Sequence, residues 1–413
     1  MKITIITAGT GSYYCGACMR DNALAKALRA AGHNALIVPM YLPLQLDEEK
    51  SEADEETPVF FGGINVYLQQ KYEIFRRLPR WFDRLLNGRM LLQAVAKRSH
   101  LTSAREQGEM TYEMLRLEES HLDKEVDKLI DWLELDGKPD VILLSNALLA
   151  GLILPLKNRV GAKVACTFQG EDSFLDGLPE PWKTKAWDEM SIRLNEADQV
   201  ISPSQFYADL MEKKTGVPSQ VIPNGIDLTG YKIRNGKNRI GYLSRMCHSK
   251  GLGLLVDAFI HLNDPTLTLV IAGTMGGGDA EYVTGLKVKL EEAGLSQHVE
   301  WHPDLDRDTK ADLLTSLSVF SVPAVYPEAF GLYLIEAMAC SVPVVMPRAS
   351  AFVEIIESSE CGILVEPENA TALAEGIRSA LKNPAAMGEH GRHKVDERYN
   401  VTAMAEKFVE MLS

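Results

Sequence analysis

The chain has 413 residues, of which 46% are hydrophobic, which is enough for two or three globular domains. Its formal net charge is −14. This charge argues against nucleic acid as a partner, because an acidic protein repels a polyanion. We find no apolar run of 18 residues and no secretory leader, and therefore expect a cytoplasmic protein without a membrane span.

The first expected elements are a strand over residues 1–7, a turn, and a helix over residues 22–32 that ends at its final glycine. Gly9 and Gly11 lie in the turn, where the lack of a side chain lets a ligand approach the backbone closely. The spacing misses the dinucleotide-binding pattern G-x-G-x-x-G, because Tyr14 stands three residues after Gly11. A nicotinamide cofactor is therefore not expected.

Cys15 and Cys18 form a C-x-x-C pair directly after this turn. The pair lacks the second ligand pair of a zinc site, and its surroundings lack a thioredoxin pattern, so packing is favoured over redox or metal chemistry. The other cysteines lie in apolar segments, as buried thiols of a reducing compartment do.

Residues 71–105 carry nine Lys or Arg and two Asp or Glu, a net charge of +7 that leaves −21 on the rest of the chain. Large apolar residues such as Trp81 and Phe82 are interleaved with the cations. Such a segment can lie on an anionic membrane surface or receive an acidic acceptor. It can also be an insertion that packs on the core and has a solvated basic rim. Both interpretations stay open.

Arg245 and Lys250 follow a short expected strand and precede a helical pattern. This order places both cations at the carboxyl end of a parallel sheet, where ligands of open α/β folds bind. Arginine can hold a diphosphate with two parallel N–H bonds, while lysine acts as a point charge. The loop therefore predicts an anion site.

Glu328 and Glu336 flank the start of a helix expected from Gly331 to about Cys340. Glu336 is the only charge in the apolar stretch 330–346, so a polar group should meet its carboxylate. The unpaired N–H groups at the helix start suit a phosphate. Two carboxylates beside an anion site resemble a pocket for a sugar nucleotide.

Taken together in their order along the chain, these motifs resemble those of the retaining glycosyltransferases of family 4. The resemblance covers most of the chain. The matching segments are Gly9 with Gly11, residues 221–227, Arg245 with Lys250, residues 269–273, residues 328–336 and residues 361–368. The resemblance implies an α/β fold of two Rossmann-like, doubly wound domains facing a cleft (GT-B architecture). We expect domains over 1–230 and 231–400, with a helix over 401–413 that returns to the first domain.

The same resemblance implies a role for each motif. Arg245 and Lys250 would hold the donor diphosphate, Glu328 the sugar and Glu336 the ribose. Such a site is metal-independent, because cations and a helix start neutralise the leaving group. Asp304 and neighbouring Asp306 have the spacing of a metal motif but lie in a stretch that is near the nucleotide base in the family.

Backbone amides around Phe330, Gly331 and Leu332 would add contacts to sugar and phosphate. Many relatives carry a histidine that approaches the donor sugar, but the corresponding strand end here carries Gln169. Glutamine can donate a hydrogen bond but cannot hold a proton. Glu328 and Gln169 are therefore the candidate catalytic residues.

The expected function is the retaining transfer of a hexose from a nucleoside diphosphate sugar, with a mild preference for UDP, to an unidentified acceptor, without a cofactor. The acceptor is expected to contact Tyr13, Tyr14, Arg20, Gln169, Glu171 and Asp172. Two enzyme alternatives on this fold are an epimerase and a phosphorylase. A third alternative is a catalytically weak protein that binds a membrane surface.

Replacing Arg76, Arg77, Arg80 and Arg84 by Gln tests the membrane interpretation of residues 71–105. The variant should sediment less with anionic vesicles, because its electrostatic attraction to the lipid surface is reduced. Equal sedimentation of the variant and the natural sequence would contradict membrane contact through this segment.

Overall fold

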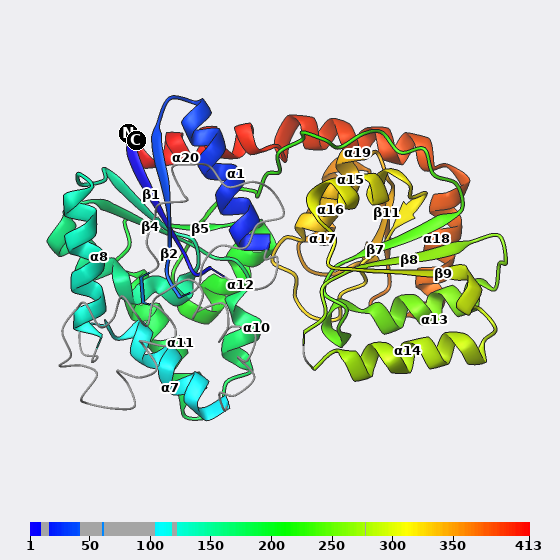
Figure 1. Cartoon of the computed structure of the whole chain (residues 1–413), viewed down its shortest axis with the longest axis horizontal. Coiled ribbons are helices and arrows are strands. Elements are labelled where there is room, and N and C mark those ends of the chain that lie inside the picture. The colour runs from blue at the N-terminus through cyan, green and yellow to red at the C-terminus, as the bar shows by residue number, and fades with distance from the viewer. Residues whose placement is uncertain (10–15, 42–59, 62–103, 118–121, 277) are drawn as a thin grey trace. The chain divides into compact units, whose positions relative to one another are not determined.

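The computed structural model describes residues 1–9, 16–41, 60–61, 104–117, 122–276 and 278–413. The chain divides into two compact units: unit 1 comprises residues 1–222 and 405–413, and unit 2 comprises residues 223–404. Figure 1 shows that each unit is a sheet with helices on both sides. No helix in these residues is long and apolar enough to cross a membrane.

The sheet described in unit 1 has six parallel strands in the order β2-β1-β3-β4-β5-β6. Its strands are β1 (Lys2–Thr7), β2 (Asn34–Pro39), β3 (Val141–Leu144), β4 (Lys163–Thr167), β5 (Gln199–Ser202) and β6 (Gln220–Val221). All four residues of β3, Val-Ile-Leu-Leu, are buried, as in a parallel strand covered on both faces. The strand order reverses between β1 and β3.

The helical segments described in unit 1 are α1 (Gly16–Ala30), α7 (Ala104–Leu115), α8 (Asp123–Leu135), η3 (Ala147–Leu152), α9 (Ile153–Pro155), η4 (Leu156–Val160), α10 (Glu171–Asp176), α11 (Trp182–Leu194) and α12 (Gln205–Thr215). Helix α1 begins six residues before the predicted start. The prediction missed its first turns because Arg20, Asp21 and Asn22 are buried polar residues that interrupt the apolar spacing. The predicted stop at Gly32, with φ of +86°, is confirmed.

The sheet described in unit 2 also has six parallel strands, in the order β12-β11-β10-β7-β8-β9. Its strands are β7 (Arg239–Leu243), β8 (Thr268–Gly273), β9 (Val299–Pro303), β10 (Val319–Phe320), β11 (Val344–Pro347) and β12 (Gly362–Val365). The order reverses between β7 and β10, which pair with Val319 opposite Ile240. The prediction of two doubly wound α/β sheets is confirmed.

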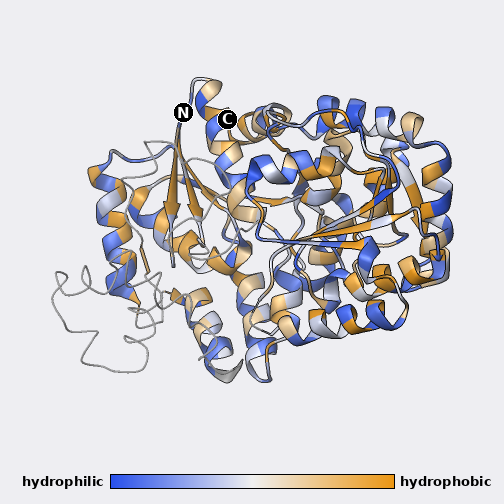
Figure 2. Cartoon of the chain, turned by 45° about the vertical axis from the view of Figure 1, so that its right-hand side comes forward, coloured by the Kyte–Doolittle hydropathy of each residue, from blue (hydrophilic) through white to orange (hydrophobic). Residues whose placement is uncertain are grey.

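The helical segments described from residue 223 onward are η5 (His248–Lys250), α13 (Leu252–Leu262), α14 (Ala280–Glu292), η6 (Ser296–His298), α15 (Arg307–Thr315), α16 (Leu332–Ala339), α17 (Phe352–Ser359), α18 (Ala370–Lys382), α19 (Pro384–Arg398) and α20 (Val401–Leu412). Helices α13 and α14 lie side by side on one face of β7–β9 (Figure 1). Figure 2 shows that the strands are mainly hydrophobic, whereas the helices carry both hydrophobic and hydrophilic residues. The cores therefore lie between sheets and helices.

The last residues of α20 belong to unit 1, although the helix begins in unit 2. Within unit 1, the Nζ of Lys163 donates to the carbonyl oxygens of Leu412 (3.3 Å) and Ser413 (3.1 Å). These bonds join the carboxyl end of the chain to the start of β4.

A substitution of Gly273, at the end of β8, tests how closely the ends of β7 and β8 approach each other. Its φ is +139°, and an added Cβ would lie 1.8 Å from the carbonyl oxygen of Ser244. We expect Gly273→Ala to lower the free energy of unfolding by about 2 kcal/mol or more, through backbone strain and overlap. Urea unfolding measures the change.

Gly285→Ala is the matched control, because Gly285 is an exposed residue of α14 and nothing lies within 4 Å of its added Cβ. Alanine is the better helix former, so this variant should gain about 0.5–1 kcal/mol. Equal effects of the two substitutions would contradict the close approach at Gly273.

Candidate functional site

The reversal between β7 and β10 brings the predicted anion-binding residues of unit 2 to one edge of the sheet. Arg245 and Lys250 lie after β7, and Glu328 lies after β10. In open α/β sheets, ligands bind at the carboxyl ends of the strands where the strand order reverses. The geometry of these loops therefore determines what the edge can bind.

Lys250 and Glu328 form an ion pair, with Nζ and Oε2 2.5 Å apart. The Nζ of Lys250 also donates to the hydroxyl of Tyr326 at 2.8 Å and lies 4.8 Å from the centre of that ring. The hydroxyl of Tyr333 donates to the same Oε2 at 2.8 Å. Two donors thus meet on one oxygen of Glu328.

Burial and the neighbouring polar groups together determine the protonation of Lys250 and Tyr333. Desolvation is the largest single influence and lowers the pKa of Lys250, but Glu328 and Tyr326 together outweigh it and raise that pKa, so the lysine stays charged. Burial, together with Glu328, raises the pKa of Tyr333 well above its usual value. The tyrosine hydroxyl therefore keeps its proton and acts as a donor.

Arg245 forms a forked pair with Asp279 at the start of α14. Its Nε donates to Oδ2 of Asp279 at 2.8 Å and its Nη2 donates to Oδ1 at 3.3 Å. The side chain of Asp279 is 11% exposed, whereas that of Arg245 is 56% exposed. The pair orients the guanidinium at the surface, and the sequence analysis did not identify Asp279.

Glu336 lies in the second turn of α16 and is buried. Its Oε1 accepts from Nζ of Lys310 at 2.7 Å and from the hydroxyl of Tyr231 at 2.9 Å. The predicted polar partner is thus present. Lys310 was not predicted, although its spacing from Ala311 and Leu314 places it on the buried face of α15.

The start of α16 lies between the two glutamates. Gly331 precedes the helix with φ of +83°, a conformation that favours glycine, and Phe330 beside it is buried. The first N–H groups of a helix, here from Leu332 onward, have no partner within the helix and attract anions. A phosphate could be held at this point.

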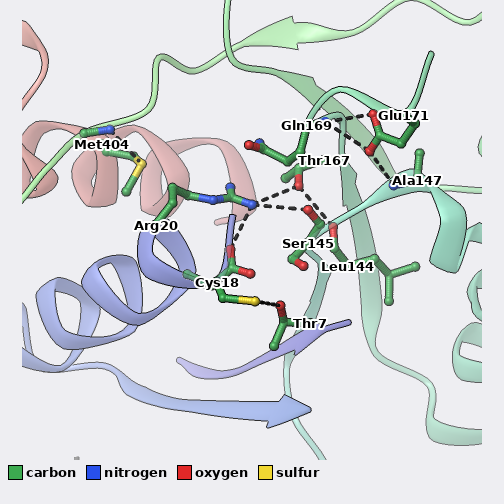
Figure 3. Close-up of polar contacts among 12 residues, drawn as sticks. Thr7, Cys18, Arg20, Leu144, Ser145, Ala147, Thr167, Gln169, Glu171 and Met404 are labelled. Carbon is green, nitrogen blue, oxygen red and sulfur yellow. Dashed lines mark hydrogen bonds and ion pairs between the residues drawn. The ribbon is translucent and has the colours of Figure 1, made fainter. Parts of the chain in front are cut away.

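Around Gln169, at the carboxyl end of β4 in unit 1, a buried carboxylate fixes the backbone (Figure 3). Glu171 accepts N–H bonds from Gln169 (3.0 and 2.8 Å), Gly170 (3.0 Å) and Ala147 (2.9 Å). Burial raises the pKa of Glu171, and these backbone bonds oppose that effect. The loop that carries Gln169 is therefore tied to the segment after β3.

The prediction that Arg20, Glu171 and Asp172 contact an acceptor is wrong, because all three are at most 4% exposed. Asp172 accepts from the hydroxyl of Tyr207 at 2.8 Å. Figure 3 shows the Arg20 guanidinium directed at the carbonyl oxygen of Ser145 and at the hydroxyl of Thr167, both 3.3 Å away. Arg20 also pairs with Asp21 at 2.8 Å. The side chains of Arg20, Glu171 and Asp172 therefore bond to other groups of unit 1.

Several predictions lie on residues outside the described part of the chain. They are Gly11, Tyr13, Tyr14, Cys15 and all but the last two residues of 71–105. Gly9 is described and has φ of +71°. Cys18 is buried, with Sγ 3.9 Å from the Thr7 hydroxyl, as packing predicts.

Among the described residues, no group of three or more His, Cys, Asp and Glu side chains could hold a metal ion. In the Asp-x-Asp sequence, Asp306 caps α15 by accepting from the N–H of Thr309 at 2.8 Å. Asp304 adopts φ of +53°, which few residues other than glycine do.

Two doubly wound units, with ionic groups at the edge where the second sheet reverses, define a protein of the two-Rossmann-domain class. Residues 228–398 match the family Glycosyl transferases group 1, and residues 114–229 match Glycosyltransferase Family 4. The chain therefore belongs to the group 1, family 4 glycosyltransferases.

A phosphatidyl-myo-inositol mannosyltransferase of Mycobacterium leprae is 26% identical over 262 residues, which are 61% of this chain and 66% of that protein. The chain thus spans just under two thirds of the length of this relative. The HepE protein of Anabaena, solved with UDP, aligns with 100% of this chain and 99% of its own at 19% identity and TM-score 0.70. Sucrose-phosphate synthase of Thermosynechococcus elongatus aligns over 100% and 98% at 20% identity and TM-score 0.74.

Glu171→Ala tests the carboxylate that organises the Gln169 loop. The substitution leaves three backbone N–H groups without their acceptor, so we expect the free energy of unfolding to fall by about 2–4 kcal/mol. Urea unfolding measures the loss.

Glu212→Ala is the control, because Glu212 is an exposed glutamate of α12 in the same unit. Its effect should stay within about 0.5 kcal/mol. A Glu171 variant as stable as the Glu212 variant would contradict the role of Glu171 in this loop.

Proposed function

We propose that the protein is a retaining glycosyltransferase that moves a hexose from a nucleoside diphosphate sugar to an acceptor without a metal ion. The observation that carries the proposal is the Lys250–Glu328 pair at the edge where the second sheet reverses, beside the start of α16. A cation and a helix start suit a diphosphate, and a carboxylate suits sugar hydroxyls.

In this proposal, the diphosphate displaces Glu328 as the main partner of Lys250. Nζ of Lys250, the exposed guanidinium of Arg245 and the first amides of α16 then stabilise the negative charge that grows on the leaving diphosphate. Asp279 holds Arg245 in one orientation, so little side-chain entropy is lost when the anion binds.

Glu328 then accepts hydrogen bonds from the hexose, with Tyr333 still donating to its Oε2. Glu336 accepts hydrogen bonds from the ribose hydroxyls of the nucleotide. For Gln169 we propose a hydrogen bond to the sugar, supported by the rigid backbone that Glu171 provides. Catalysis rests on positioning and on electrostatic stabilisation of an oxocarbenium-like sugar.

The similar proteins guide the choice of donor. The mycobacterial relative is a mannosyltransferase, and HepE was also solved with UDP-glucose. A hexose linked to UDP is therefore the first donor to test. Transfer that continues without free phosphate would exclude a phosphorylase.

A thermal shift with UDP, GDP and ADP, each in chelator and then with magnesium, tests the donor site. A ligand that binds only the folded protein raises the melting temperature. Stabilisation by one nucleotide in chelator identifies the base and supports a metal-free diphosphate site. No shift with any of the three contradicts the proposal.

Lys250→Ala and Glu328→Ala should separate binding from transfer. Removing Lys250 should weaken binding of the nucleoside diphosphate by about 10–100-fold, because a charged hydrogen bond is lost. Glu328→Ala should leave this affinity unchanged or tighter, since the carboxylate no longer competes for Lys250, but should lower kcat at least about 100-fold. Calorimetry and a transfer assay measure the two effects.

Lys237→Ala is the control, because Lys237 is an exposed lysine of the same unit. It should change neither affinity nor kcat. Normal binding of the nucleoside diphosphate by Lys250→Ala would contradict the phosphate role of Lys250.

A further inference from the structure

The surroundings of Glu336 repeat the arrangement around Glu328. In both cases one carboxylate oxygen accepts a bond from a lysine and a bond from a tyrosine hydroxyl. At Glu336 the donors are Lys310 and Tyr231, and both are buried, at 8% exposure each. The family motif contains the glutamates, but these two donors come from other parts of the chain.

Three segments of unit 2 converge on Glu336: helix α16 itself, helix α15 with Lys310, and the stretch before β7 with Tyr231. Arg392 of α19 strengthens this convergence. Its Nη1 donates to the carbonyl oxygens of Tyr231 (3.3 Å) and Ala339 (2.5 Å), which joins the tyrosine backbone to the end of α16. Tyr231 is therefore fixed relative to the helix that carries the glutamate.

The hydroxyl of Tyr231 must donate, since the oxygen of Glu336 is the acceptor. Burial and the nearby carboxylate raise the pKa of Tyr231 well above its usual value, so the hydroxyl keeps its proton. Both donors bond to the same oxygen of the carboxylate, Oε1. Among the described residues, no side chain or backbone group bonds to Oε2.

A buried lysine–glutamate pair is a weak source of stability, because desolvation of the two charges offsets their attraction. Its clearest physical effect is to fix the direction of the carboxylate. The pair also balances charge, since Lys310 offsets the repulsion that Glu336 would exert on a diphosphate.

We propose that Lys310 and Tyr231 are positioning residues that hold Glu336 so that its Oε2 reads the ribose hydroxyls of the nucleotide. The proposal rests on the proposed function, in which Glu336 takes the ribose. It predicts that discrimination between ribose and deoxyribose depends on two residues that themselves do not touch the nucleotide.

The test is calorimetric binding of UDP, 2′-deoxy-UDP and 3′-deoxy-UDP, or of GDP or ADP and their deoxy forms if the thermal shift selects another base. The natural sequence should bind at least one deoxy form about tenfold or more weakly, because a hydrogen bond to a carboxylate is lost. In Tyr231→Phe this ratio should fall below about threefold, mainly through weaker binding of the ribonucleotide.

Lys310→Met should reduce the ratio in the same way, and Lys310→Arg, which keeps the charge, should retain more of it. If Lys310→Met fails to fold, Tyr231→Phe decides, because it removes one hydroxyl only. The control is Tyr282→Phe, which removes a hydroxyl that accepts from the N–H of Gly253 at 2.8 Å. The control should keep the ratio.

A ratio that is near one in the natural sequence, or unchanged in both Tyr231→Phe and Lys310→Met, overturns the positioning role while leaving the donor site intact. Absence of binding by any nucleoside diphosphate to the natural sequence overturns the proposed function and this inference together. The two failures are thus distinguishable.

Discussion

Two carboxylates beside one apolar helix, Glu336 buried and Glu328 with a side chain only 12% exposed, are the constraint on which the edge of unit 2 depends. Glu328 and Glu336 flank the start of α16, where the core is made of aliphatic and aromatic side chains. A carboxylate removed from water without partners is strongly unfavourable, so each one needs donors, and each receives one from a lysine distant in the sequence. A lysine and a tyrosine hydroxyl supply them in both cases, which links the loop after β7 and helix α15 to α16.

These pairs shape the electrostatics of the edge. Each carboxylate is balanced by its own lysine, and Arg245 is balanced by Asp279, so the cations are held in place by partners that neutralise them. In the proposed function, an incoming diphosphate would meet oriented cations and helix amides and would compete with Glu328 for Lys250. The proposed function thus couples binding of the anion to release of the Glu328 carboxylate toward the sugar.

Predictions from the sequence were correct where they rest on residues that are close together in the chain. The apolar runs predicted the strands, Gly32 predicted the end of α1, and the apolar stretch around Glu336 predicted that a polar group would meet it. Predictions failed where polar residues are buried. The turns of α1 around Arg20 and Asp21 lack an apolar spacing, and Glu171 looked like an acceptor contact although its carboxylate binds backbone N–H groups.

The sequence by itself determined the α/β class, the order of the motifs and the resemblance to a glycosyltransferase family, because these depend on residues close together in the chain. The tertiary structure alone decided which charges meet. Lys250 and Glu328 are 78 residues apart, and Tyr231 and Glu336 are 105 apart. Such pairs form only when the strand order brings distant loops to one edge of the sheet, since local spacing carries no information about that contact.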